Sequence, residues 1–125
     1  MNLLVADGGK WKSLGVVYGS IIIYNGDNLI LYPKTTFVFD SNRTSNEAEY
    51  LTVIQGLEIA LELGIRELRI ISDSLLIVNQ VKGLYRVRAP HLQPYVTQIR
   101  EMLYTLDSYE LDKVHRDIIV EHLGH

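Results

Sequence analysis

The sequence predicts an α/β fold in which a five-stranded mixed sheet carries helices on both faces. Three observations support this class. Two strand-like segments flank Asn25-Gly26, a strong hairpin signal because both residues tolerate positive φ. A long amphipathic helix is indicated from Thr44 to Gly64, and the strand after it suggests a parallel crossover. We therefore expect an antiparallel meander of the first three strands, with the first, fourth and fifth strands parallel.

The expected element order is β-β-β-α-β-α-α-β-α. The expected strands cover residues 3–6, 16–24, 28–39, 67–72 and 109–115, and the expected helices cover residues 44–64, 74–81, 90–106 and 117–125. The first apolar run ends at Asp7-Gly8-Gly9, which indicates a tight turn. Alternation puts Leu3, Val5 and Asp7 on one face of that strand. Ser74 and Pro90 are expected to begin the second and third helices.

The helix from Thr44 to Gly64 begins with a capping box, because Glu47 stands three residues after Thr44. At about 100° per residue, its apolar residues gather on one side, and Glu47 falls on the opposite side, facing water. Glu49 falls at the edge of the apolar side. A half-buried carboxylate costs free energy unless it is paired or bound to a metal, so Glu49 is the first indication of a site.

Composition limits the possible functions. The chain has 47% hydrophobic residues, no cysteine and a net charge of −3. We expect one domain over residues 1–125, without disulfides or thiol chemistry. Neither a secretion signal nor a membrane-length apolar run is visible, which favours a cytoplasmic protein that does not enter a membrane. The net charge argues against a non-specific nucleic-acid coat protein, but not against a metal-dependent enzyme.

Three acidic residues share a predicted location. Asp7 ends the first strand, Asp73 ends the fourth, and Glu49 lies near the start of the intervening helix. Each alone is typical of a turn, a helix edge or a strand end. Sites in open α/β sheets lie at the carboxyl ends of strands, where three carboxylates repel one another unless a cation neutralises them. Oxygen-only ligation favours Mg²⁺ or Mn²⁺ over zinc. Two such ions roughly 3.5–4 Å apart suit in-line phosphoryl chemistry.

The chain resembles type 1 ribonuclease H over roughly residues 1–116. The resemblance rests on residues 7–9, residues 44–50 and residues 72–74 with Asn79-Gln80, and residues 85–92 are similar to the compact bacterial and archaeal members. It implies a ribonuclease H-like fold and a metal-dependent endonuclease. Such an enzyme cuts the RNA strand of an RNA/DNA hybrid and leaves 3′-hydroxyl and 5′-phosphate ends.

The resemblance also implies roles for individual residues. Asp7 would bridge two Mg²⁺ ions (or Mn²⁺), with Glu49 and Asp73 on one ion each. Glu121 is the expected fourth ligand, with Asp117 as the alternative. Thr44 would hold a DNA-strand phosphate, and Ser45 and Asn46 would lie near the scissile RNA. The expected substrate-binding residues are Gly8, Gly9, Thr44, Ser45, Asn46, Asn79, Tyr85, Arg86 and Arg88.

The sequence departs from the family in two places. Ser45 stands where the family has Asn, so a shorter hydrogen-bonding arm should weaken substrate contact. The last helix is short or truncated, and Glu121 matches the family's final Asp only after a two-residue deletion. The residues His115, His122 and His125 are expected at the surface, with His115 or His122 as minor candidates for proton transfer.

Two other functions stay open. A ribonuclease H-like module with a degenerate last helix could bind a hybrid without cleaving it. A structural protein with no nucleic-acid role would leave the three placed carboxylates unexplained. We expect a monomer whose partner is an RNA/DNA hybrid.

Overall fold

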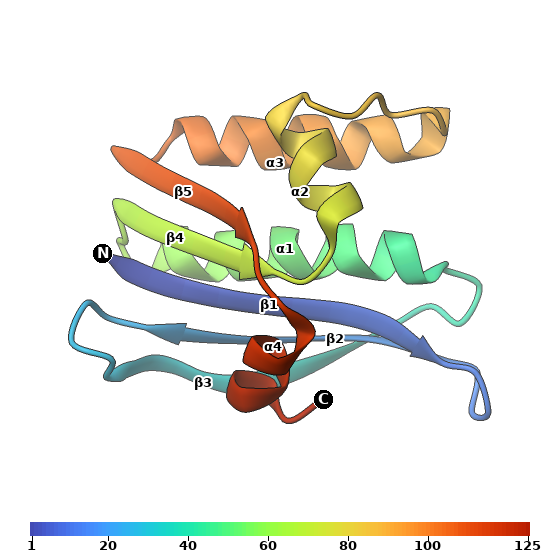
Figure 1. Ribbon diagram of the computed structural model, residues 1–125, viewed down its shortest axis with the longest axis horizontal. Helices are drawn as coiled ribbons and strands as arrows, with labels where there is room; N and C mark the ends of the chain where they lie inside the picture. Colours follow the sequence, from blue (N-terminus) through green and yellow to red (C-terminus); the bar gives the residue numbers. More distant parts are fainter.

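The computed structural model describes all residues 1–125 and contains one five-stranded sheet in the order β3-β2-β1-β4-β5 (Figure 1). Its strands are β1 (Asn2–Trp11), β2 (Val16–Tyr24), β3 (Ile30–Phe39), β4 (Glu67–Ser72) and β5 (Ser108–Lys113). Strand β1 pairs antiparallel with β2 and parallel with β4. The outer pairs are antiparallel for β2 and β3 and parallel for β4 and β5. The predicted mixed sheet is confirmed.

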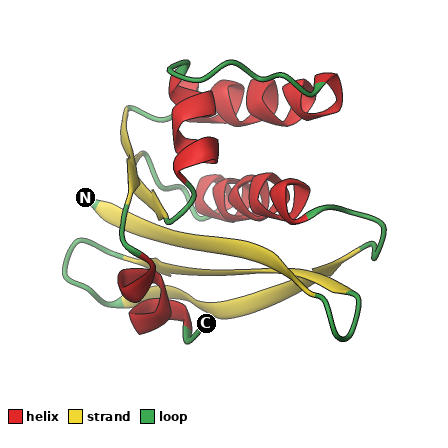
Figure 2. Cartoon of the chain, turned by 45° about the vertical axis from the view of Figure 1, so that its right-hand side comes forward, coloured by secondary structure: helices red, strands yellow, loops and turns green.

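Helices cover both faces of this sheet. They are α1 (Ser45–Glu62), α2 (Leu75–Lys82), α3 (Gln93–Tyr104) and α4 (Arg116–Leu123), with a 3₁₀ turn, Pro90–Leu92, before α3. Helix α4 lies on the opposite side of the sheet from the other three (Figure 2). A core of 21 buried residues lies beneath α1, α2 and α3, and a smaller core of five lies beneath α4. The predicted placement of helices on both faces is confirmed.

None of these helices combines the length and the hydropathy that a crossing of the lipid bilayer requires.

The predicted turn at Asp7-Gly8-Gly9 is wrong. These residues lie within β1, which pairs with β2 as far as Trp11 opposite Val16. Gly8 is needed for close packing rather than for a turn, because a Cβ there would lie 2.6 Å from the carbonyl oxygen of Ala48 in α1. The backbones of β1 and α1 are therefore in direct contact beside Asp7.

The hairpin between β2 and β3 was predicted correctly, but its geometry differs from a two-residue turn. The positive φ of 62° belongs to Asn28, not to Gly26. The Asn25 side-chain oxygen accepts the N–H groups of Asp27 and Leu29 at 2.8 and 3.0 Å. This side-chain cap closes the longer loop and fixes the register of the two strands.

Other boundaries shift by a few residues. Helix α3 ends at Tyr104 rather than at residue 106, and β5 covers 108–113 rather than 109–115. Helix α4 begins at Arg116 and ends before Gly124, whose φ of 79° is the left-handed conformation of a helix C-cap. This cap turns the chain back toward β2.

Candidate metal centre and adjoining groove

Three carboxylates from two strands and one helix converge at one edge of the sheet. Asp7 lies on β1, Asp73 follows β4, and Glu49 lies in the first turns of α1. One carboxylate oxygen from each lies within 4.8 Å of the other two. The strands β1 and β4 are parallel neighbours, so their carboxyl ends point the same way. The structure thus brings together the three acids that the sequence singled out.

The free energy of holding these charges together is visible in two pKa values. Burial raises the pKa of Glu49 to about 7, a hydrogen bond with the Ser74 side chain opposes this rise, and the charges of Asp73 and Asp7 add to it. Burial also raises the pKa of Asp7, against the opposing hydrogen bond and charge of Arg116. Both shifts show that negative charge here is under-compensated by the protein.

Arg116, the first residue of α4, supplies the one guanidinium in contact with this cluster. Its Nη1 donates to Asp73 Oδ2 at 2.9 Å and to Asp7 Oδ2 at 3.0 Å. The side chain is 46% exposed, so it can swing toward solvent. Sequence reasoning missed this role, although Arg116 follows a strand at the same edge as Asp7 and Asp73.

The structure does not bring Glu121 or Asp117 to the cluster, which corrects the predicted fourth ligand. Helix α4 faces the sheet with Ile119 and Leu123, which are 0% and 1% exposed. At about 100° per residue, Glu121 points roughly opposite to that face, and Asp117 is turned well away from it. Both carboxylates are exposed.

A histidine occupies the neighbourhood where a fourth carboxylate was expected. The Nδ1 atom of His125 lies 3.1 Å from Asp7 Oδ2, and its Nε2 atom lies 2.8 Å from Ser20 Oγ. The imidazole also meets the Tyr18 ring edge-on, with 5.2 Å between centroids. His125 was expected at the surface, and its side chain is 22% exposed there, because the Gly124 cap folds it back over β2.

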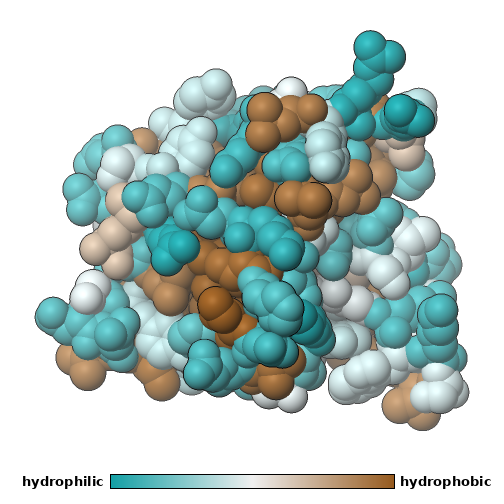
Figure 3. Space-filling model, viewed as in Figure 1, coloured by the Kyte–Doolittle hydropathy of each residue, from teal (hydrophilic) through white to brown (hydrophobic).

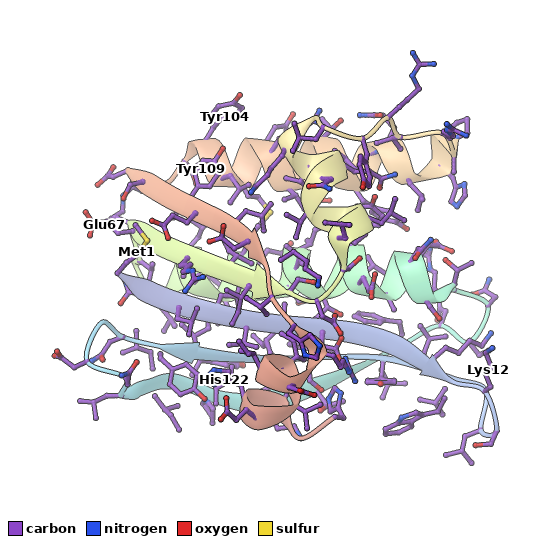
Figure 4. All side chains as sticks on the ribbon, viewed as in Figure 1. Met1, Lys12, Glu67, Tyr104, Tyr109 and His122 are labelled. Atoms are coloured by element: carbon purple, nitrogen blue, oxygen red, sulfur yellow. The ribbon has the colours of Figure 1, made fainter.

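The other two histidines lie away from the carboxylates. His115 is exposed and caps α4, where its Nδ1 accepts the N–H of Asp117 at 3.2 Å. His122 lies over the sheet, and its Nδ1 is 3.1 Å from the Tyr24 hydroxyl (Figure 4). Neither contacts Asp7, Glu49 or Asp73, so the structure gives no support to proton transfer by either.

Glu47 belongs to a separate network, and the expectation that it faces water is wrong. The residue is only 8% exposed. The predicted capping box is present: Glu47 N–H donates to Thr44 Oγ1, and Thr44 N–H donates to Glu47 Oε1, both at 3.1 Å. Arg43 donates to Glu47 Oε2 at 3.0 Å, and the Tyr95 hydroxyl lies 3.4 Å from the same oxygen. Helix α3 supplies Tyr95, which periodicity within α1 could not reveal.

Beside the carboxylates, α1, α2 and the connector after α2 enclose a groove of about 490 Å³. It is lined by Asn46, Leu76, Gln80, Leu84, Tyr85, Arg86, Arg88, Ala89 and Leu92. Four of the predicted substrate-binding residues are therefore brought together. Gln80 is 5% exposed, and its side-chain oxygen has no hydrogen-bond partner in the protein. A larger groove of about 720 Å³, between α3 and β5, contains none of the predicted site residues.

The remaining predicted substrate-binding residues are spread around this region. Thr44 and Ser45 are exposed at the start of α1. Asn79 uses its backbone carbonyl to accept the N–H groups of Leu84 and Tyr85, so it shapes the connector. Gly8 is buried against α1, which assigns it a packing role, and Gly9 is half-buried on β1.

The face that carries α4 is mixed in character. Hydrophobic side chains gather in its middle, and hydrophilic side chains surround them (Figure 3).

The sequence is similar to a known protein family and to proteins of two organisms. Residues 9–121 match the sequence pattern of the family described as reverse transcriptase-like. The chain is 28% identical over 98 residues to ribonuclease HI of Halobacterium salinarum, covering 78% of this chain and 44% of that protein. It is 28% identical over 100 residues to a bifunctional protein of Mycobacterium tuberculosis, covering 80% of this chain and 27% of that protein. The chain thus spans less than half the length of either relative.

Solved structures show the same fold. The RNase H1 structure from Halobacterium salinarum superposes with a TM-score of 0.89 at 24% identity, covering 98% of this chain and 91% of that chain. The N-terminal RNase H domain of the Mycobacterium tuberculosis protein gives 0.87 at 25% identity, covering 98% and 92%. LC11-RNase H1, solved in complex with an RNA/DNA hybrid, gives 0.85 at 22% identity, covering 98% and 91%. The predicted resemblance and fold are confirmed.

Proposed function

The chain belongs to the reverse transcriptase-like family, and on that premise we propose that it is a metal-dependent ribonuclease H. Its substrate would be an RNA/DNA hybrid, whose RNA strand it hydrolyses internally. The relative named ribonuclease HI and the neighbour solved in complex with an RNA/DNA hybrid support this assignment. The observation that carries it is the convergence of Asp7, Glu49 and Asp73 at the carboxyl ends of parallel strands.

The donor set fits a hard divalent cation. Three carboxylate oxygens within 4.8 Å of one another are the ligands that Mg²⁺ and Mn²⁺ prefer. The raised pKa of Asp7 and of Glu49 fits a site whose missing positive charge comes from outside the protein. We propose Mg²⁺ as the physiological ion, with two ions per site. When bound, such a pair polarises the attacking water and stabilises the leaving oxygen.

The adjoining groove supplies the substrate contacts in this proposal. Arg86 and Arg88 would hold backbone phosphates, and the exposed Tyr85 ring would pack on a sugar or base. Asn46 lies one turn before Glu49 on the same side of α1, so it would bind the minor-groove edge near the cut.

One observation favours a second candidate, a hybrid-binding module without turnover. Helix α4 places no carboxylate at the cluster, and the Arg116 guanidinium already contacts Asp7 and Asp73. In this alternative the groove would bind the hybrid while the site stays inactive.

A cleavage assay decides between the two. RNA labelled at its 5′ end is annealed to DNA and incubated with the protein and Mg²⁺. We expect internal cuts in the RNA strand, ending in 3′-hydroxyls, and no cutting of single-stranded RNA or duplex DNA. Asp7→Asn should retain less than about 1% of the rate, since it removes a ligand of the metal. Asp27→Asn, an exposed loop acid, is the matched control.

Hybrid binding is measured in parallel by fluorescence anisotropy. Binding without cleavage by the unaltered protein would establish the binding module, and neither binding nor cleavage would reject both candidates. The expected single domain, monomeric state and cytoplasmic location stay predictions.

A further inference from the structure

We propose that His125 supplies the ligand that α4 does not, with its Nδ1 completing the metal site beside Asp7. This inference rests on the proposed function, because it concerns the same metal centre. It starts from a gap: three carboxylates converge, and the two acids expected to complete the set, Glu121 and Asp117, are turned away on α4. Two side chains reach the cluster from this end of the chain, the Arg116 guanidinium and the His125 imidazole, and of these only the imidazole can ligate a cation.

One ring nitrogen of the His125 imidazole is fixed by a hydrogen bond, as in metal-binding histidines. A metal-bound histidine has its second ring nitrogen fixed by a hydrogen bond, which sets the direction of the first. Here Nε2 lies 2.8 Å from Ser20 Oγ, and that hydroxyl lies 2.8 Å from Thr36 Oγ1. Ser20 is 0% exposed, so the anchor is rigid. With Nε2 fixed in this way, Nδ1 is aimed at Asp7.

The anchor also permits the required tautomer. In the metal-free protein, Ser20 can donate to Nε2 while the Nδ1 proton is shared with Asp7. Since a hydroxyl also accepts, Ser20 can instead accept from Nε2–H, which frees the Nδ1 lone pair without loss of the anchor. The imidazole can therefore become a ligand by moving its proton from Nδ1 to Nε2.

The spacing agrees with ligation. Two adjacent ligands at roughly 2.0–2.1 Å from one ion, at right angles, stand about 3 Å apart. The distance between His125 Nδ1 and Asp7 Oδ2 is 3.1 Å. These two atoms can therefore share one cation.

The same three groups have the connectivity of a hydrolytic triad, with Asp7, His125 and Ser20 in sequence. That function is excluded, because Ser20 is 0% exposed and its oxygen lies between His125 and Thr36. The hydroxyl cannot reach a substrate. The buried Ser20 hydroxyl instead holds the His125 imidazole in place by a hydrogen bond.

A nitrogen ligand makes the site selective. Imidazole nitrogen favours transition metals, whereas an all-carboxylate site suits Mg²⁺ equally well. We expect His125 to raise the preference for Mn²⁺ over Mg²⁺, and His125→Asp to shift that preference back toward Mg²⁺.

The test uses Mn²⁺ alone with the full chain, labelled with ¹⁵N in its histidines. Electron spin-echo modulation should show one directly bound ¹⁵N on Mn²⁺. His125→Ala should remove this signal and weaken Mn²⁺ binding about tenfold in calorimetry. His122→Ala, near the end of α4 and bonded to Tyr24 instead of Asp7, should keep both (Figure 4).

The outcomes separate the two proposals. No bound nitrogen in the unaltered protein, or an unchanged signal in His125→Ala, would overturn the ligand assignment, even if His125→Ala folds poorly. Cleavage of the hybrid without a nitrogen signal would leave the proposed function intact. A nitrogen signal without cleavage would reject the proposed function and keep the metal ligand.

Discussion

The first turns of α1 contain two glutamates whose pKa values shift in opposite directions. On one side, Glu47 accepts hydrogen bonds from the Thr44 N–H and the Arg43 guanidinium. Burial alone would raise the pKa of Glu47, but these bonds outweigh it and lower the pKa below 4.5. On the other side, burial raises the pKa of Glu49 to about 7, and the charges of Asp73 and Asp7 add to this rise. Burial raises the pKa of both carboxyls. At Glu47 the hydrogen bonds outweigh that effect, whereas at Glu49 burial dominates and the neighbouring carboxylates add to it.

The difference teaches how to distinguish a structural carboxylate from a functional one. Glu47 has its hydrogen bonds completed by the protein, and it stabilises the fold. Glu49 is held in a place where its charge is unfavourable until a ligand arrives. The predictions below test this division, from the largest expected effect to the smallest.

Glu49→Gln should produce the largest effect, and in two directions. Hybrid cleavage with Mg²⁺ should fall by at least about 100-fold, because a metal ligand is lost. The metal-free protein should meanwhile become more stable above pH 7, by about 2 kcal/mol after allowance for solvent screening. Cleavage rates and urea denaturation in a chelator measure the two effects.

The pH dependence of this stability has a definite sign. The pKa of Glu49 is raised from 4.5 to about 7 in the folded state. Between these values the folded protein binds more protons than the unfolded chain, so the stability of the unaltered metal-free protein falls as pH rises from 4.5 through 7. Glu49→Gln should flatten that fall. Parallel stability curves for the two proteins would contradict the assignment of Glu49.

Glu47→Gln should act on the fold instead. We expect a loss of about 1 kcal/mol at pH 7, because the Gln amide oxygen can still accept the Thr44 N–H but the charge-assisted hydrogen bond from Arg43 is weakened. Since the folded pKa is lowered, this contribution is present above pH 4.5 and is lost as pH falls through the lowered value. The two proteins should converge in stability once the pH is below the lowered pKa of Glu47.

Glu58→Gln, at an exposed position of the same helix, is the matched control and should stay within about 0.5 kcal/mol of the unaltered protein. A Glu47→Gln variant as stable as this control would show that Glu47 is not structural.

Arg116→Gln should change metal binding more modestly. The guanidinium contacts Asp7 and Asp73 at 3.0 and 2.9 Å, and an incoming cation must displace it. We expect Mg²⁺ to bind about three- to fivefold more tightly in the variant, consistent with a partly exposed ion pair of about 1 kcal/mol. Calorimetry measures the affinity. Weaker Mg²⁺ binding in the variant would mean that Arg116 helps to hold the ion. Arg69→Gln removes the same charge from an ion pair elsewhere on the sheet and is the control.

Ser45→Asn should give the smallest effect. The longer amide adds one hydrogen-bonding arm at the exposed start of α1, next to the groove. We expect KM for the hybrid to fall about two- to threefold with kcat unchanged, as for a gain of uniform binding. Steady-state kinetics measure both constants. An altered kcat would mean that residue 45 affects the chemical step and not only substrate binding.

Much of the fold and part of the site followed from the sequence because both rest on local rules. Alternation placed Asp7 on the face of Leu3 and Val5, and strand ends located Asp73. The capping box of Thr44 and Glu47 is present as predicted. Periodicity separated Glu47 from Glu49 correctly, but it assigned Glu47 to water because Arg43 and Tyr95 come from outside the helix.

The remainder depends on contacts between distant residues. His125 and Asp7 are 118 residues apart, and one glycine cap brings them together. Motif alignment treated α4 as a place for a carboxylate, whereas the packing of Ile119 and Leu123 decides which side chains reach the sheet. Applying the strand-end rule to β5 as well would have pointed to Arg116.

The contact at Gly8 has a consequence for how the proposed metal site can fail. Asp7 and Glu49 are spaced by two backbones that touch, since a Cβ at Gly8 would lie 2.6 Å from the Ala48 carbonyl oxygen. Rotation of the side chains does not change the distance between the backbones of β1 and α1. That distance increases only if α1 leaves the sheet, which also exposes the larger core to solvent. Amide hydrogen exchange at Ala48 and Glu49 should therefore proceed only through global unfolding. The spacing of the Asp7 and Glu49 carboxylates and the folded state are then lost in one cooperative event.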